Sequence, residues 1–323
     1  MSRSGVLLLG FGGPESVEDV RPFMRNLMGR EPSDALVDSV IQRYESIGGG
    51  SPLPRIAAQI AAGLEERLEA NGLSVPVRVG MRYWNPFIAD SIAELVGLGC
   101  SRIVTVSLSP FESQVASGAY REAIEMACKA HDGVEVVEAP LVSRLEAFTT
   151  YFADSTRAAL AQVGEDGAVV AFTAHSLPIS DIVEDDPYLT GLQSTAMTVA
   201  EKIGLAAGAE GTGTHLAEGF SALGTDHGPH PWYLVYQSKG AKPGPWLGPE
   251  LGALVDAVAA SPGSALVVCP LGFMTDHMET LWDLDSVAAD HAAREGVRFA
   301  RATVPNDDAA VLDAILASAK PLF

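Results

Sequence analysis

Short apolar runs that end near glycine or proline and alternate with helical segments are the feature that most limits how this chain can fold. In the first part of the chain, short apolar runs predict strands at residues 5–9, 75–80 and 102–108. Apolar residues at helical spacing flank the second run, at residues 56–70 and 88–97. Strands that alternate with helices through short connections pair in parallel. The sequence therefore predicts an α/β domain with a parallel sheet flanked by helices.

The same succession returns in the second part of the chain. A Trp and a Pro stand in the loop before a helix in both parts, and the later strands are predicted at residues 168–173, 232–236 and 265–269. This repetition predicts two domains, of residues 1–145 and 146–323. Two such domains facing one another would form a cleft at the carboxyl ends of their strands, where open α/β sheets bind ligands. The sequence leaves open whether the last helix, around residues 307–316, packs back on the first domain.

Composition excludes several classes of protein. The chain has 323 residues, of which 41 are acidic and 21 basic, and its formal charge of −20 would repel nucleic acid and anionic membranes. No apolar run reaches the ~18 residues that span a bilayer. The apolar run at residues 6–9 is too short for an export signal. We therefore expect a cytoplasmic protein without a transmembrane segment.

The cysteines Cys100, Cys128 and Cys269 are odd in number and show no C-x-x-C spacing. This pattern favours a reducing compartment and argues against a disulfide framework or a zinc ribbon. Each cysteine is most simply interpreted as a small buried hydrophobic residue.

An acidic segment follows the apolar run at residues 265–269. Asp276, Glu279 and Asp283 are spaced so that a helix would carry their carboxylates on one face. Like charges at that spacing destabilise an isolated helix unless water or a cation compensates. Two interpretations stay open here, a solvated acidic face and a track of ligands for a divalent cation.

Histidines provide further candidate functional groups. His175 directly follows the predicted strand at residues 168–173, and opposite an acidic helix face it is a candidate proton acceptor, although a lone histidine there is often structural. His215, His227 and His230 could form a metal-binding loop. They lack the H-x-x-x-H spacing of a helical metal site, and turn chemistry explains the segment better.

The glycines after the first strand do not predict a dinucleotide site. Gly10, Gly12 and Gly13 resemble a phosphate-binding loop, but Pro14 and Glu15 follow and the third glycine of the motif is missing. The glycines instead allow the backbone to approach a flat ligand or a neighbouring strand closely.

Several motifs together resemble the ferrochelatase family, in its short bacterial form. The resemblance extends nearly from end to end and depends on five motifs: LGFGGP at residues 9–14, RYESIGGGSPL at 43–53, FTAHSLP at 172–178, YQS at 236–238 with PWLGP at 245–249, and PLGF at 270–273 with DHME at 276–279. It implies the chelatase fold of two Rossmann-like domains. It also implies that a porphyrin binds in the cleft and that iron(II) is inserted without a redox change.

The resemblance implies roles for the acidic segment and for His175. His175 and Glu279 are the central catalytic pair, in which His175 accepts pyrrole protons and is the first iron ligand, and Glu279 assists metal or proton transfer. Asp283 and Asp276 extend the row of metal-binding carboxylates outward. Hard oxygen ligands of this kind also suit an accessory Mg²⁺.

The resemblance also implies porphyrin-binding residues. Arg43, Ser51 and Tyr120 stand where contacts to the propionates are expected, although Arg43 could pair with a nearby acid and Tyr120 could be a buried helix residue. Tyr83 and Trp84 suit the apolar porphyrin plane, or an ordinary hydrophobic plug of the loop. Phe11 stands where many bacterial relatives carry a tyrosine, so a phenolate ligand is not available from that position.

We expect no resident cofactor. Cys269 coincides with one ligand position of the [2Fe-2S] cluster of some relatives, but three cysteines cannot supply the four ligands of such a cluster. Ferrous iron is a substrate, and the porphyrin substrate implied by the resemblance is coproporphyrin III, with protoporphyrin IX as the alternative. Other hypotheses are a chelatase for a different divalent metal and a two-lobed porphyrin or haem carrier. We expect a monomer that contacts other haem-pathway enzymes transiently.

Overall fold

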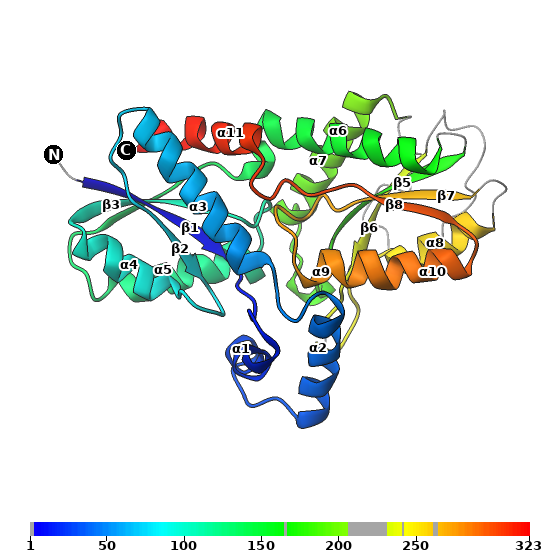
Figure 1. The fold of residues 1–323 in the computed structure, drawn as a ribbon, viewed down its shortest axis with the longest axis horizontal. Coiled ribbons are helices and arrows are strands. Elements are labelled where there is room, and N and C mark those ends of the chain that lie inside the picture. Colours follow the sequence, from blue (N-terminus) through cyan, green and yellow to red (C-terminus); the bar gives the residue numbers. More distant parts are fainter. Residues whose placement is uncertain (1–2, 165–166, 206–230, 241, 261–263) are drawn as a thin grey trace. The chain divides into compact units, whose positions relative to one another are not determined.

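A computed structural model describes residues 3–164, 167–205, 231–240, 242–260 and 264–323 (Figure 1). His215, His227 and His230, considered above as a metal-binding loop, lie outside the described residues. Across the part of the chain that is described, none of the helices combines the length and the apolar character needed to cross a membrane.

The chain divides into two compact units. The first contains Met1–Ala147 together with Met274–Met278 and Asn306–Phe323, and the second contains Phe148–Phe273 and Glu279–Pro305. The change of unit after Ala147 lies two residues beyond the predicted domain boundary. The predicted second domain was one continuous segment, whereas two of its pieces belong to the first unit.

The first unit is built on a parallel sheet with the strand order β2-β1-β3-β4. Its strands are β1 (Arg3–Gly10), β2 (Val77–Met81), β3 (Cys100–Ser107) and β4 (Glu135–Glu138). Successive side chains of β1 point to opposite faces, so Leu7 and Leu9 share one face. There they pack with α4 (Ile88–Gly97) and α5 (Ala119–Cys128) in one core cluster.

The other face of the first sheet is covered by α3 (Leu53–Ala70) and α11 (Ala309–Ala319). The helices α1 (Val20–Met28) and α2 (Asp34–Ser46) pack against each other past the carboxyl end of β1 (Figure 1). The helix α11 lies against α3, where Arg67 Nε donates to Asp313 Oδ1 at 2.6 Å. The C-terminal helix, which the sequence left unplaced, therefore completes the first unit.

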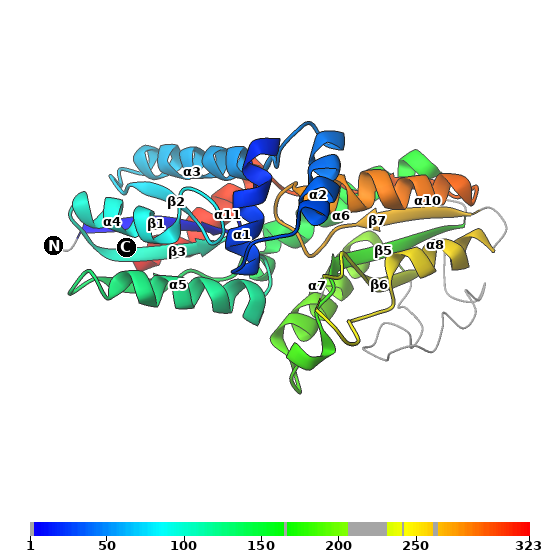
Figure 2. The same cartoon turned by 90° about the horizontal axis from the view of Figure 1, so that it is seen from below.

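The second unit repeats this design with the strand order β6-β5-β7-β8, again in parallel. Its strands are β5 (Ala168–His175), β6 (Trp232–Gln237), β7 (Ala265–Cys269) and β8 (Arg298–Arg301). The helices α6 (Glu146–Val163) and α7 (Pro187–Ile203) lie on one side of it, and α8 (Leu251–Ala259) and α10 (Ala289–Arg294) on the other (Figure 2). Apolar residues of β5, β7 and α8 form the core on the α8 side.

Equivalent strands of the two sheets also end in the same way. The N–H of Met81, the last residue of β2, donates to the carbonyl of Pro86 at 2.7 Å. In β6, the N–H of Tyr236 donates to the carbonyl of Pro249 at 2.9 Å. Both prolines follow cis peptide bonds. The repetition read from the sequence is therefore confirmed in the strand order and in these turns.

The six strands predicted from the sequence are confirmed, with ends that shift by at most two residues. The prediction of one helix that carries three carboxylates on a single face is wrong. The helix α9 spans Met278–Leu281, so Asp276 precedes it. After Trp282, which also has helical φ and ψ, the chain continues as the π-helical segment η5 (Asp283–Ala288).

Candidate active site

The last residue of β5, His175, lies at the carboxyl end of the second sheet and contacts Glu279. Its Nδ1 lies 2.8 Å from Oε2 of Glu279. The backbone of His175 is held by the hydroxyl of Tyr188, which donates to the His175 carbonyl at 2.8 Å. Because Nδ1 faces the carboxylate, Nε2 is the ring nitrogen left to take a proton or a metal.

A glycine allows the loop after β7 to pass close to the end of β5. A Cβ added at Gly272 would lie 2.7 Å from Cβ of Ala174, which is closer than such atoms approach. The Gly272 N–H donates to the Thr173 carbonyl at 2.9 Å. This close approach brings the chain that leads to Glu279 to the strand that carries His175.

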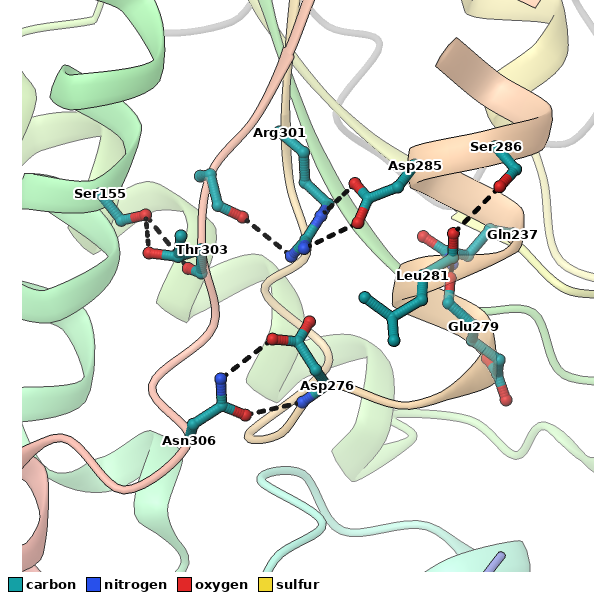
Figure 3. Close-up of polar contacts among 11 residues, drawn as sticks. Ser155, Gln237, Asp276, Glu279, Leu281, Asp285, Ser286, Arg301, Thr303 and Asn306 are labelled. Atoms are coloured by element: carbon teal, nitrogen blue, oxygen red, sulfur yellow. Dashed lines mark hydrogen bonds and ion pairs between the residues drawn. The ribbon is translucent and has the colours of Figure 1, made fainter. Parts of the chain in front are cut away.

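Residues at the end of β6 hold Glu279 and Asp283, the two acidic site candidates of this unit. Gln237 Nε2 donates to the Glu279 carbonyl at 2.8 Å, and the hydroxyl of Ser238 donates to the carboxylate of Asp283. Figure 3 shows the side chain of Gln237 beside the main chain of Glu279. Gln237 and Ser238, two adjacent residues at the end of β6, thus hold Glu279 and Asp283.

Opposing effects set the pKa of His175. Burial lowers it, but the charge and the hydrogen bond of Glu279, with a smaller contribution from the charge of Asp283, outweigh burial and raise the pKa above its usual value of 6.5. The side chains of His175 and Glu279 are 33% and 27% exposed, so protons can pass between the pair and solvent. This arrangement can accept a proton and release it.

Asp276 is held in a different way and belongs to the first unit. Its N–H donates to Asn306 Oδ1 at 2.8 Å, and Asn306 Nδ2 donates to its Oδ2 at 2.9 Å (Figure 3). Asp276 therefore fastens two segments of the first unit to each other. Within the described ranges, no three His, Cys, Asp or Glu side chains are grouped so that they could hold a metal ion. Of the predicted metal ligands, His175, Glu279 and Asp283 belong to the second unit and Asp276 to the first.

The predicted aromatic residues lie at the carboxyl end of the first sheet. The rings of Phe11 and Tyr83 have centroids 4.7 Å apart, and the guanidinium of Arg82 lies 4.9 Å from the centroid of Tyr83. Phe11 is 36% exposed, whereas Trp84 is buried and packs edge-on against Phe23. Phe11 and Tyr83 can therefore offer ring surface to a ligand. The burial of Trp84 agrees with the alternative interpretation, in which this residue is a hydrophobic plug of the loop.

The glycine after Phe11 is required by this packing. Gly12 has a φ of +96°, and a Cβ added there would lie 2.9 Å from the backbone nitrogen of Trp84. Any other residue would be strained and would push the two loops apart.

The residues predicted to bind propionates differ in accessibility. Arg43 is exposed in the last turn of α2. Ser51 is nearly buried, and its hydroxyl accepts from the Leu53 N–H at the start of α3. Tyr120 is buried in the core, with its hydroxyl 3.1 Å from Ser109 Oγ, and burial raises its pKa to about 12. The structure thus shows Tyr120 as a buried helix residue, which was the alternative to a contact with a propionate.

Sequence reasoning missed the supporting residues Gln237, Ser238, Tyr188 and Asn306. Gln237 and Ser238 stood in a quoted motif. The available signal was that Gln237, like His175, stands at the end of a predicted strand, and the two residues pair across β6 and β5. Polar residues that end neighbouring parallel strands meet at one edge of the sheet. Tyr188 and Asn306 act through contacts distant in sequence, which no local pattern reveals.

Solved structures with a similar architecture are chelatases. SirB from Bacillus subtilis with Fe3+ gives a TM-score of 0.56 at 12% identity, covering 99% of this chain and 95% of that chain. CbiX, described as the terminal enzyme for biosynthesis of siroheme in denitrifying bacteria, gives 0.52 at 11% identity and covers 99% of both chains. At these identities the likeness supports the fold alone. The chain therefore shares the chelatase fold with these two proteins.

Sequence relatives identify the family within this class. The family model Ferrochelatase matches residues 3–320. A coproporphyrin III ferrochelatase of Nocardia farcinica is 34% identical over 95% of this chain and 85% of its own length. A ferrochelatase of Deinococcus radiodurans is 31% identical over 94% of this chain and 91% of its own. The chain belongs to the ferrochelatase family, and the resemblance seen in its motifs is confirmed.

Proposed function

We propose that this ferrochelatase inserts ferrous iron into coproporphyrin III and releases two pyrrole protons. Family membership supports iron insertion into a porphyrin, and relatives at 32–34% identity named for coproporphyrin III support the choice of substrate. The observation that carries the chemistry is the 2.8 Å contact between His175 Nδ1 and Glu279 Oε2.

The reaction exchanges two protons for one dication, so no electron moves and no redox cofactor is needed. In our proposal, Nε2 of His175 accepts the two pyrrole protons one after the other, and the adjacent carboxylate stabilises the imidazolium that forms each time. Partial exposure of the pair lets the proton leave to solvent. Iron then meets the deprotonated imidazole, in the arrangement by which carboxylates commonly orient metal-ligating histidines.

Asp283 is proposed as the next oxygen ligand for arriving iron, because its carboxylate belongs to the same unit and its charge acts on His175. Asp276 belongs to the first unit, where Asn306 binds it through both its main chain and its carboxylate, and it is left out of the proposed metal route. An accessory Mg²⁺ gains no support, because the described residues contain no group of three suitable ligands.

Porphyrin binding is proposed for the first unit. Phe11 and Tyr83 offer ring surface for the apolar plane, and Trp84 supports their loop. Arg43 is the accessible cation for a propionate, and Ser51 offers a hydroxyl. Tyr120 could reach a carboxylate only if its contact with Ser109 opened.

A reducing cytoplasm is the proposed compartment. Cys100, Cys128 and Cys269 are all free thiols, and Cys100 and Cys269 are buried, which agrees with their interpretation as small core residues. A monomeric state is also proposed, and light scattering of the purified protein would test it.

The proposed function is tested by anaerobic metallation of coproporphyrin III and protoporphyrin IX at equal concentration. We expect kcat/KM to be at least about tenfold higher for coproporphyrin III, a difference of ~1.4 kcal/mol in transition-state binding. Equal values, or a preference for protoporphyrin IX, would reject the substrate. Tight binding of either porphyrin without metallation would instead indicate a carrier.

Competition among divalent metals completes this test, because imidazole and carboxylate ligands discriminate weakly among first-row metals. Fe²⁺, Co²⁺ and Zn²⁺ are supplied together, and the metalloporphyrins are separated by their absorption spectra. We expect the iron product to form fastest. Faster insertion of cobalt would favour the hypothesis of a chelatase for another metal.

A further inference from the structure

The end of β6 carries features that the fold alone does not require. Gln237 is the last residue of β6 and pairs in register with His175 of β5, and the Ser176 N–H donates to the Gln237 carbonyl at 2.8 Å. Gln237 and Ser238 are therefore fixed directly beside the candidate proton acceptor.

The side chain of Gln237 is buried, yet only half of its amide is satisfied. Its Nε2 donates to the Glu279 carbonyl at 2.8 Å and lies 3.3 Å from Ser238 Oγ. Its Oε1 is buried and, among the described residues, has no hydrogen-bond partner. A buried polar atom without a partner destabilises a protein, so packing alone does not explain an amide at this position. The amide is explained by the hydrogen bond from its nitrogen, which holds the main chain of Glu279 in place.

Ser238 has a backbone conformation that disfavours a residue with a side chain. Its φ is +60°, in the left-handed region that glycine adopts without strain. Glycine, however, could not donate to the carboxylate of Asp283 as the Ser238 hydroxyl does. Strain of this kind persists where a residue has a specific task, and the observed strain at Ser238 points to such a task.

The helical segment that carries the acids is widened at the point that Ser238 contacts. The π-helix η5 begins at Asp283, and the Val287 N–H donates to the Trp282 carbonyl at 2.9 Å, five residues back. Wide turns of this type are rare and are frequently found at functional sites. The hydrogen bond from Ser238 to Asp283 thus joins the strained residue to the start of the widened turn.

We propose that Gln237 and Ser238 are positioning residues that hold Glu279 and Asp283 in place for the transfer of iron to His175. Gln237 fixes the main chain at Glu279. Ser238 accepts a hydrogen bond from Gln237 and donates one to Asp283, so both acids are tied to the end of one strand. This inference rests on the proposed function and assigns these two residues to the metal side of the site, not to the porphyrin.

The test uses Ser238→Gly in the full-length protein, because this change relieves backbone strain while it removes the hydroxyl. We expect its Tm to equal or exceed that of the wild type, and kcat/KM for Fe²⁺ to fall about 10- to 100-fold, as for other outer-shell metal partners. The Kd for coproporphyrin III should stay within about twofold of the wild type, because Ser238 is assigned to the metal side of the site and not to the porphyrin. A merely structural residue would not lower iron turnover while raising stability.

A matched control is Asp185→Gly. Asp185 is an exposed residue of the same unit with a φ of +54°, so this change also relieves a left-handed backbone. It should raise Tm in the same way and leave iron kinetics unchanged. Gln237→Met provides a second variant that keeps side-chain length and removes the hydrogen bonds. It should fold at least as stably as the wild type and raise KM for Fe²⁺.

The outcomes separate this inference from the proposed function. If wild-type protein does not metallate coproporphyrin III, the proposed function fails. If the wild type is active and both Ser238→Gly and Gln237→Met retain its kcat and KM for Fe²⁺, the positioning role is overturned and the proposed function stands.

Discussion

The two sheets of this ferrochelatase have the same strand order, but the residues at their carboxyl ends differ in chemistry. The first sheet ends in the aromatic pair of Phe11 and Tyr83, and the second ends in His175 with Glu279 beside it. The strands that end at Met81 and Gln237 even make the same turn onto a proline carbonyl. The topology therefore fixes where side chains can gather, and the residue types decide whether the end of a sheet offers ring surface or exchanges protons.

The difference between the two sheet ends is tested most strongly by removing the carboxylate at the end of the second sheet. Glu279→Gln keeps the shape of the side chain but removes the carboxylate beside His175. We expect kcat for iron insertion to fall about 100-fold, because a positioned proton-transfer group contributes 10²–10⁴-fold. Porphyrin binding should change little. Stopped-flow metallation and fluorescence titration of the porphyrin measure the two effects separately, and a loss of porphyrin affinity with unchanged kcat would contradict the assignment.

The loop geometry of the first sheet can be tested by a change in stability. Gly12→Ala should lower the free energy of unfolding by about 2–3 kcal/mol, because the new Cβ is strained at positive φ and meets the Trp84 backbone. Gly29→Ala is the control, because Gly29 also has a positive φ but an added Cβ meets nothing within 4 Å. That control should lose only about 1 kcal/mol. Urea unfolding would show whether the two losses differ.

A smaller effect is expected from trimming the aromatic pair of the first sheet. Phe11→Ala should weaken coproporphyrin III binding about tenfold, or ~1.4 kcal/mol, because a ring contact is lost. The kcat for iron insertion should stay close to that of the wild type. Met126→Ala, which trims a side chain that is 70% exposed on α5 of the same unit, should alter neither quantity. An unchanged Kd in Phe11→Ala would remove Phe11 from the porphyrin site.

The smallest predicted effect is a change in how stability depends on pH. Because the folded pKa of His175 is raised, its contact with Glu279 stabilises the fold fully below pH ~6.5, and this contribution disappears as pH rises through the folded pKa. In Glu279→Gln, burial should dominate and lower the pKa, so the sign of the dependence should reverse. NMR titration of the His175 ring in both proteins measures this directly. A His175 pKa that is equal in the two proteins would show that Glu279 does not control it.

Much of the fold could be predicted because buried parallel strands are continuous apolar runs, as in residues 265–269. The edge strands β4 and β8 were not predicted. They are only four residues long and carry charged residues at both ends, so neither stands out as an apolar run, whereas the edge strands β2 and β6 do. Motif resemblance identified His175 and Glu279, whose contact the structure shows.

The rest of the site could not be predicted because it depends on contacts between distant segments. The acidic spacing suggested one helix face, but Asn306, 30 residues beyond Asp276, holds Asp276 ahead of the helix. Ser238 reaches Asp283 across 45 residues, and its strained backbone is invisible in a sequence. Tertiary hydrogen bonds of this kind override local periodicity.

The central claim, that the carboxyl end of the second sheet performs the proton and metal exchange, is tested most directly by anaerobic metallation of coproporphyrin III in His175→Ala. The control is His291→Ala, because His291 forms a similar pair with Asp256, at 2.7 Å, elsewhere in the same unit. We predict that His175→Ala loses at least about 100-fold in kcat, while His291→Ala metallates at the wild-type rate. Equal rates for His175→Ala and the wild type would contradict the account.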